Sequence, residues 1–318
     1  MPVANPSSII GICFHTIFFP IHLSLFVTYA AFYFLLFRHL PLPAAVRKLL
    51  LWCLMGVSGM WWADLQLDGV KRGSLSQQPR SRVPRAGSII AANFTSPIDA
   101  LYLVTIFDPI FVSSHPLSRK VRRISLFSAI CAALSRSPQL SDLATWETNN
   151  AGNLTDFRAL LARHPGRVIA VFPECGTTNG KGVLPLSPCL LAVPAENPIF
   201  PVSMRYTPPD VTTPVPGAKA LAIFLWKLLG TSPHTIRVRL AEAVFNTSGA
   251  SNGVSHTEAQ TGAPRGGWEG RAEDQPTAEE QKLLDRVAEA LARLGRVKRV
   301  GLTLKEKKAF VKAWTEKK

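Results

Sequence analysis

A long apolar run occupies the front of the chain. Residues 9–37 contain no Asp, Glu, Lys or Arg, and the run exceeds the roughly 20 apolar residues that cross the hydrocarbon of a bilayer. His15, Pro20 and His22 interrupt it. The pattern therefore predicts a membrane-anchoring segment, which is either one kinked spanning helix or two half-helices that enter and leave by the same face.

A second apolar run, residues 49–67, contains tryptophans typical of the membrane interface and has Asp64 near its end. It has two interpretations: a helix at the membrane surface, or a buried amphipathic helix of the following domain. Between the two runs, Arg38, Arg47 and Lys48 place the C-terminal end of the first run on the cytoplasmic side. We therefore expect the rest of the chain to face the cytosol.

Strand-like and helix-like patterns alternate from residue 87 onward. Apolar or alternating runs predict strands at residues 87–94, 168–172, 196–206 and 235–245, and apolar runs predict helices at residues 99–107 and 222–230. This mixture is typical of an α/β domain. We place that domain at residues 71–245, after an N-terminal anchor at residues 1–70.

The tail divides into two parts. Residues 246–276 are rich in Gly, Ser, Thr, Ala and Glu, so burial cannot offset their ordering entropy and we expect a disordered loop. Residues 277–318 predict amphipathic basic helices. The first begins with a capping pair, Thr277 and Glu280. The second, in which aromatic residues alternate with lysines, is either peripheral or lies on a membrane surface.

Composition narrows the range of partners. The 318-residue chain carries a formal net charge of +15 and is 47% hydrophobic, a combination that suits an anionic membrane, and no nucleic-acid motif accompanies the basic residues. We therefore expect membrane lipids, and no nucleic acid, as partners. The five cysteines and seven histidines are scattered, so neither a metal site nor a disulfide framework is predicted.

Two strand ends carry polar residues that could perform chemistry. In "AANFTSPIDALYL" a buried strand turns into a helix, with Ser96 at the N-cap, Pro97 at the first helical position and Asp99 at the third. In "RVIAVFPECGTTNG" a β-branched strand ends at Glu174, and a loop of Gly, Thr and Asn follows. Helix capping and an ordinary turn explain these residues structurally. Alternatively, the amides and hydroxyls of the second loop could receive a phosphate.

The first of these stretches resembles a signature of the glycerolipid acyltransferases. The lysophosphatidic acid acyltransferase branch of that family carries Asn-His-x-Ser-x-x-Asp here, and Asn93, Ser96 and Asp99 match it. Phe94 occupies the histidine position. In the family, that histidine is oriented by the Asp and takes the proton of the acceptor hydroxyl as it attacks an acyl-CoA thioester.

The second stretch resembles another signature of the same family. "FPECGTTNG" is similar to Phe-Pro-Glu-Gly-Thr-x-x-Asn-Gly, but Cys175 stands at the first glycine. We expect the flexible residue to have moved one place, to Gly176, and Cys175 to be a small buried residue rather than a nucleophile. By resemblance, Glu174 and the loop residues Gly176, Thr177 and Thr178 hold the glycerol phosphate of the acceptor.

A middle signature of the family is a strand that ends in a phosphate-binding Arg. "AICAALSRSP" places Arg136 at a similar distance from the first signature, and the planar guanidinium suits bidentate pairing with phosphate. The basic cluster Arg119, Lys120, Arg122 and Arg123 competes for this role, although it also fits a solvated or lipid-facing surface.

The resemblance implies a fold, a reaction and a location. The fold is a glycerol-3-phosphate acyltransferase-like mixed sheet flanked by helices, with N-terminal membrane-anchoring helices. The reaction is acyl-CoA-dependent conversion of lysophosphatidic acid to phosphatidic acid, with acyl-CoA as co-substrate and no cofactor. The catalytic candidates are Asp99 and Glu174, and the substrate-binding candidates are Asn93, Phe94, Ser96, Arg136, Gly176, Thr177 and Thr178. The location is the endoplasmic reticulum membrane, and a hairpin-like anchor would also permit lipid droplets.

Phe94 leaves a second function open. A positioned base contributes about 10²–10⁴-fold, and Phe94 cannot supply it, so the chain is alternatively an impaired relative that binds lysolipid or acyl-CoA as a sensor or scaffold. Proximity alone can contribute about 7–11 kcal/mol, and Asp99, with a pKa raised by apolar neighbours, could act as a poor base. Both enzymatic interpretations require Asp99 and Glu174 to face each other across one cleft that opens to the bilayer.

Overall fold

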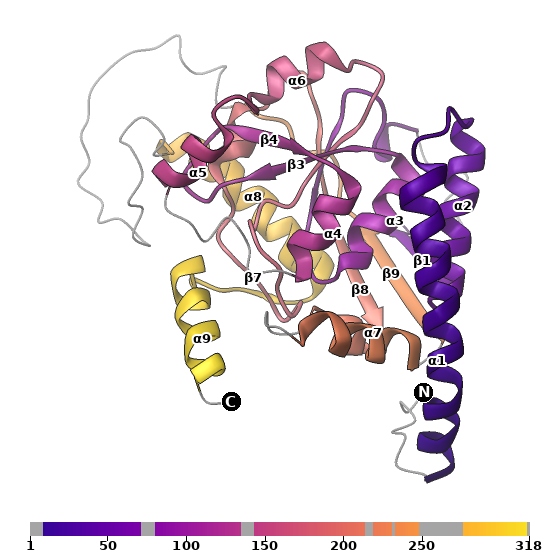
Figure 1. Ribbon diagram of the computed structural model, residues 1–318. Coiled ribbons are helices and arrows are strands. Elements are labelled where there is room, and N and C mark those ends of the chain that lie inside the picture. The colour runs from indigo at the N-terminus through magenta and orange to yellow at the C-terminus, as the bar shows by residue number, and fades with distance from the viewer. Residues whose placement is uncertain are drawn as a thin grey trace, which may run out of the picture.

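A mixed eight-stranded sheet with helices on both faces forms the protein in the computed structural model, which describes residues 9–70, 80–134, 143–213, 219–230, 233–247 and 276–316 (Figure 1). The strand order is β1-β9-β8-β2-β6-β3-β4-β5. The strands are β1 (Met60–Leu67), β2 (Ile89–Ala92), β3 (Ile110–Ser114), β4 (Val121–Ile124), β5 (Leu154–Thr155), β6 (Ile169–Val171), β8 (Ile199–Thr207) and β9 (His234–Leu240). A separate pair joins β7 (Gly182–Val183) to β10 (Lys298–Arg299).

The helices cover this sheet and extend beyond it. They are α1 (Ile9–Phe32), α2 (Ala44–Val57), α3 (Pro97–Phe107), α4 (Leu126–Leu134), α5 (Leu143–Asn150), α6 (Phe157–Arg163), α7 (Ala220–Gly230), α8 (Ala278–Gly295) and α9 (Leu304–Glu316). A π-helical turn, Tyr33–Phe37, continues α1, and short 3₁₀ turns lie at Arg80–Arg82, Pro188–Ala192 and Pro209–Val211. The α/β class predicted from the sequence is confirmed, and each predicted strand overlaps an observed one.

The centre of the sheet is parallel and buried on both faces. β2 pairs in parallel with β6 on one side and β8 on the other, with Ala91 opposite Val171. Ile90 and Ala92 of β2 pack on the face that carries α2, α3 and α7, whereas Ile89 and Ala91 pack on the face that carries α6 and α8. Because side chains alternate along a strand, each face of the sheet needs its own helical cover.

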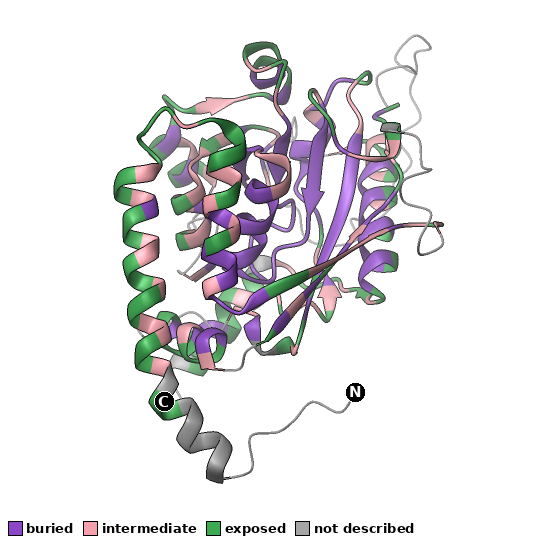
Figure 2. Cartoon of the chain, turned by 90° about the vertical axis from the view of Figure 1, so that its right-hand side faces the viewer, coloured by how far each residue is buried: buried purple, intermediate pink, exposed green. Residues whose placement is uncertain are grey.

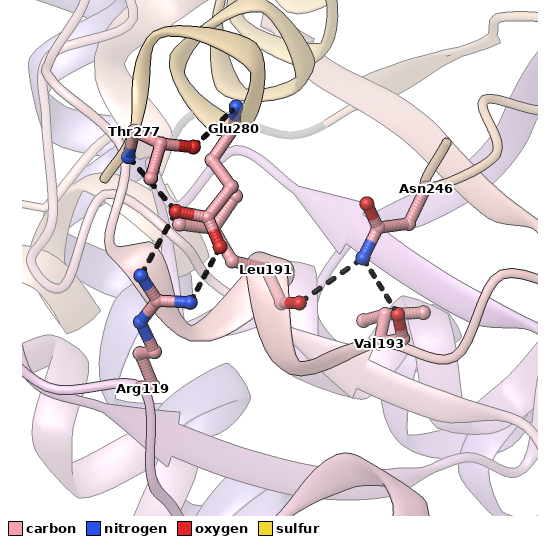
Figure 3. A network of polar contacts seen from close by, with 6 residues as sticks. All are labelled: Arg119, Leu191, Val193, Asn246, Thr277 and Glu280. Atoms are coloured by element: carbon pink, nitrogen blue, oxygen red, sulfur yellow. Dashed lines mark hydrogen bonds and ion pairs between the residues drawn. The ribbon is translucent and has the colours of Figure 1, made fainter. Parts of the chain in front are cut away.

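Helix α8 provides part of that cover, so the C-terminal segment belongs to the core. Its predicted cap is confirmed: the Thr277 hydroxyl accepts the Glu280 amide, and the Glu280 carboxylate accepts the Thr277 amide. Arg119 donates two hydrogen bonds, of 2.7 and 2.9 Å, to the same Glu280 carboxylate (Figure 3). Nearby, Asn246 donates to the carbonyls of Leu191 and Val193. Most of the predicted 246–276 loop, from residue 248 to 275, lies outside the described residues.

The second apolar run is not one helix, so both interpretations of residues 49–67 are wrong. α2 ends at Val57, Gly59 adopts a left-handed φ of 81°, and β1 begins at Met60. β1 pairs in parallel with β9 over its whole length, and this pairing with a distant strand overrides the helical pattern. Trp61 and Trp62 consequently project from an edge strand, where they are 73% and 71% exposed.

The first apolar run forms one helix that continues through Pro20. Within the described residues, only Phe19–Phe37 is long and apolar enough to cross a membrane by length and composition. Phe19 packs on Trp226 of α7, with ring centroids 4.5 Å apart, while most of the helix surface is exposed or half-buried (Figure 2). Beyond this helix, Arg47 pairs with Asp108, and Lys48 donates to the Ile106 carbonyl, which ties α2 to the end of α3.

Candidate active site

The corner after β2 is fixed to the neighbouring strand β8. The side-chain nitrogen of Asn93 donates to the Met204 backbone carbonyl at 3.0 Å, and the side-chain oxygen of Asn93 accepts the Met204 backbone amide at 2.7 Å. Ser96 is the N-cap of α3, and Asp99 completes a capping box with it, as the sequence predicts. Because Asn93 substitutes for a missing strand partner, the backbone between Asn93 and Ser96 is held at the carboxyl edge of the sheet.

Asp99 is fully buried, and both of its oxygens are occupied. One oxygen accepts the Thr95 amide at 2.6 Å and the Ser96 amide at 2.8 Å, and the other accepts the Tyr206 hydroxyl. Burial raises the pKa of Asp99 to about 6, against the opposing effect of these hydrogen bonds. The raised pKa was expected. Both oxygens of the Asp99 carboxylate therefore accept hydrogen bonds from the backbone of this corner or from Tyr206, which holds the corner in place.

Phe94 fills the histidine position with a core side chain. Its ring stacks on Phe172 at the end of β6, with centroids 4.1 Å apart and planes 16° apart. Phe172 in turn lies parallel to Phe111 of β3 at 6.2 Å. The ring can neither accept a proton nor donate one, so any base at this site must come from another residue.

Glu174 lies at the corresponding corner after β6. It is 2% exposed, and one of its oxygens accepts the Leu184 amide at 3.1 Å. Burial raises the pKa of Glu174 to about 7; the Leu184 hydrogen bond and Lys307 oppose the rise, and the charge of Asp99 adds to it. A carboxylate with this pKa is half-ionised near neutral pH, which is the range in which a general base works best.

Cys175 adopts a left-handed backbone at the position where the family signature has its first glycine. Its φ is 54°, whereas Gly176 is absent from the described residues with positive φ. The expectation that the flexible position had moved to Gly176 is therefore wrong, because the turn itself requires a left-handed residue directly after Glu174. The Cys175 thiol lies 3.1 Å from the Ser114 hydroxyl, and burial raises its pKa to about 12. A neutral buried thiol is not a nucleophile at neutral pH.

The two corners are in direct contact. Residues 174–180, here called the signature loop, return to the first corner, where the Thr178 amide donates to the Phe94 carbonyl at 2.8 Å. Gly180 has a φ of 68°, and a Cβ on it would lie 3.3 Å from the Thr95 methyl group. Asp99 and Glu174 therefore belong to one site, as expected. Both are buried, so the expected open cleft is not present at these carboxylates in this state.

Lys307 of α9 also belongs to this site, although no sequence pattern indicated it. Its ammonium donates to the Thr177 carbonyl and lies 3.5 Å from the Thr177 hydroxyl. Burial lowers the pKa of Lys307, and the charge of Glu174 opposes that effect. Several lysines surround it in the sequence, so its inward position depends on where α9 packs.

The remaining candidates lie elsewhere or cannot be placed. Arg136 lies outside the described residues. Arg119, one of its competitors, pairs with Glu280 at the start of α8. His115, a buried histidine that neither signature includes, lies beside Trp146, and its ring nitrogen accepts the Leu117 amide. Among the described residues, no three His, Cys, Asp or Glu side chains are grouped as metal ligands.

Comparisons with known proteins give a partial match. No protein-family model matches the chain. Over 155 residues the chain is 30% identical to a protein of Schizosaccharomyces pombe named "Putative lysophosphatidic acid:oleoyl-CoA acyltransferase", and the match covers 49% of this chain and 48% of that protein. The chain thus matches about half the length of this relative. The match agrees with the family that the two signatures predicted.

Among solved structures, the crystal structure of the 1-acyl-sn-glycerophosphate (LPA) acyltransferase PlsC from Thermotoga maritima aligns with 87% of this chain and 97% of its own. The two are 15% identical, with a TM-score of 0.42.

Proposed function

We propose that this chain, a relative of the glycerolipid acyltransferases, is an acyl-CoA-dependent lysophospholipid acyltransferase that converts lysophosphatidic acid to phosphatidic acid. One observation carries the proposal. The two family signatures, far apart in the sequence, meet at the carboxyl ends of the adjacent parallel strands β2 and β6. The name of the Schizosaccharomyces pombe relative supplies the two substrates, lysophosphatidic acid and oleoyl-CoA.

Glu174 is the general base in this proposal. The acceptor hydroxyl attacks the thioester carbonyl carbon, the carbon–sulfur bond breaks, and the hydroxyl proton passes to Glu174 and from there to the departing thiolate. Phe94 cannot take the proton, and the oxygens of Asp99 are engaged with the backbone and Tyr206. Glu174, with a pKa of about 7, accepts a proton at the pH of the cell.

Substrate access requires the signature loop to move. Asp99 and Glu174 are 0% and 2% exposed, so no acceptor hydroxyl reaches either of them in this state. The contacts that close the site include the Thr178 amide to the Phe94 carbonyl, the Phe94 backbone to the Glu174 carboxylate, and Lys307 to Thr177. We therefore interpret the structure as a closed resting state whose loop opens for substrate.

Membrane association forms part of the same proposal. The Phe19–Phe37 helix meets the length and composition of a span, and Trp61, Trp62 and Trp226 are exposed beside it. Tryptophan favours the bilayer interface. We propose residence in the endoplasmic reticulum membrane, with the α/β domain on the cytosolic side, and access to lipid droplets.

The test is turnover of labelled oleoyl-CoA and lysophosphatidic acid by the purified protein in detergent. We expect product from the parent, loss of about 10²–10⁴-fold in Glu174→Ala, and no change in Glu196→Ala, which removes an exposed carboxylate from another loop. Absence of product under conditions in which both ligands bind would refute the proposed acyltransferase activity.

That last result would favour a second function, a lipid-binding sensor or scaffold. The observation behind it is the packing of Phe94 on Phe172 and the burial of both carboxylates. Phe94→His separates the two functions further, because a gain in turnover would mean that the corner retains catalytic geometry.

A further inference from the structure

The C-terminal stretch is held against the signature loop by backbone pairing. β10 pairs in parallel with β7, which directly follows the loop, and the Val300 amide donates to the Val183 carbonyl at 2.9 Å. A Cβ on Gly182 would lie 2.5 Å from the Val300 side chain, so glycine is required for this close approach. The pairing brings the start of α9 beside the loop, although the two are more than 100 residues apart in the sequence (Figure 1).

Lys307 is the lysine of α9 that enters the site. Lys305, Lys308 and Lys312 of the same helix are exposed, whereas Lys307 is half-buried and donates to the carbonyl of Thr177, with the Thr177 hydroxyl 3.5 Å away. The surface lysines fit a solvated helix face. Lys307 needs another explanation, because placing an ammonium group among buried residues costs free energy unless that group is well paired.

The pairing of Lys307 with the described residues is incomplete in the closed state. An ammonium group has three donors, and within the described part of the chain its hydrogen-bond partners are the two oxygens of one residue, Thr177, the second at the limit of hydrogen-bonding distance. Glu174 attracts it electrostatically, but the raised pKa of Glu174 leaves that carboxyl only partly ionised near neutral pH. The cation is thus placed next to a loop with hydroxyls and amides and lacks a full anionic partner.

We propose that Lys307 binds the phosphate monoester of a substrate at the signature loop, an inference that rests on the proposed acyl transfer. A phosphate dianion offers the charge that Glu174 supplies only in part, together with oxygens for the remaining donors. Binding would draw the ammonium from the Thr177 carbonyl and loosen the contact that holds the loop closed. Two substrates carry this group: the lysophosphatidic acid acceptor, and CoA through its 3′-phosphate.

The kinetic test compares Lys307→Gln with Lys307→Arg and with the matched control Lys308→Gln. We expect Lys307→Gln to raise KM for the phosphorylated substrate by about tenfold or more, the effect of one charge-assisted hydrogen bond, with kcat changed little. Lys307→Arg should restore most of the affinity, and Lys308→Gln should match the parent. Unchanged KM values for both substrates in folded Lys307→Gln, or a loss confined to kcat, would overturn the proposal.

Two arms identify the source of the phosphate. If the acceptor supplies it, KM for lysophosphatidic acid rises in Lys307→Gln, whereas that for monoacylglycerol does not. If CoA supplies it, KM for oleoyl-CoA rises, whereas that for oleoyl-3′-dephospho-CoA does not. Either pattern supports phosphate binding, and equal rises for the phosphorylated and unphosphorylated members of both pairs contradict it.

A labelling measurement on the parent protein tests the phosphate site without relying on turnover or on the folding of a variant. An amine-reactive label on Lys307, quantified by peptide mass spectrometry, should be slowed several-fold by glycerol 3-phosphate or by 3′-AMP and not by glycerol or adenosine. Equal labelling with all four compounds would reject the phosphate site. If the parent shows no turnover but retains this protection, the proposed function fails while the phosphate site stands.

Discussion

Glu174→Gln should make the protein more stable at alkaline pH while abolishing its activity. Burial holds the pKa of Glu174 at about 7, against an ordinary value of 4.5. Because the folded state holds the proton more tightly than the unfolded state, the native carboxyl contributes stability below pH 4.5 that is lost as the pH rises through 7. At about 1.4 kcal/mol for each pH unit, the loss amounts to roughly 3 kcal/mol.

The amide variant avoids this loss. Gln keeps the shape of the side chain and an oxygen for the Leu184 amide, and it cannot ionise. We therefore expect parent and variant to unfold at similar temperatures at pH 4.5, and the variant to unfold later at pH 8. Since about 1 kcal/mol corresponds to roughly 2–4 °C in domains of 150–250 residues, a difference of several degrees is expected in thermal scans in detergent.

The decisive quantity is how the difference in unfolding temperature between Glu174→Gln and the parent changes with pH, not its size at one pH. Glu196→Gln, which alters an exposed carboxylate, should follow the parent at every pH. A Glu174→Gln advantage of equal size at pH 4.5 and pH 8 would show that the benefit does not arise from ionisation. A variant less stable than the parent at pH 8 would show that the buried anion is well paired, contrary to our reasoning.

Three substitutions and one labelling experiment test the roles of other site residues. Phe94→His should cost about 1 kcal/mol of stability through the lost ring stacking, measurable by thermal scan, and raise kcat if the corner retains catalytic geometry. Asp99→Asn should keep turnover within about tenfold, since its role is to hold the corner, whereas a loss of 10² or more would make it a base. Asp99→Ala should lower the unfolding free energy by about 1–3 kcal/mol, because buried donors, including the Tyr206 hydroxyl, lose their acceptor. The Cys175 thiol should resist iodoacetamide at pH 8 while exposed Cys53 reacts, with the modified peptides read by mass spectrometry.

Local signals in the sequence predicted the parts of the site that depend on local structure. Ser96, Pro97 and Asp99 specify a helix start through capping, and the structure has that cap. The strand before Glu174 was equally clear, and two parallel strands of one sheet end at the same edge. The meeting of the two corners therefore followed from strand direction and from the family resemblance.

Features that depend on distant contacts were not predictable. The run at residues 49–67 reads as one helix, and it changes to a strand at Met60 because β9 offers an edge for pairing. Lys307 enters the site only because β10 pairs with β7. The left-handed backbone at Cys175 was missed because residue type predicts glycine for such a position, yet burial and the Ser114 contact keep a cysteine there.

A phenylalanine stands at the histidine position, and a buried carboxyl lies at the neighbouring corner. Phe94 and Phe172 stack where the two corners meet, and the Phe94 backbone hydrogen bond opposes the rise in the pKa of Glu174. Burial is the main cause of the raised pKa of Glu174, and its value of about 7 lies close to the ordinary value of about 6.5 for histidine. The carboxyl of Glu174 therefore titrates in the range in which an imidazole would. The replacement of His by Phe is therefore compatible with base catalysis at neutral pH, with the proton taken at the second corner instead of the first.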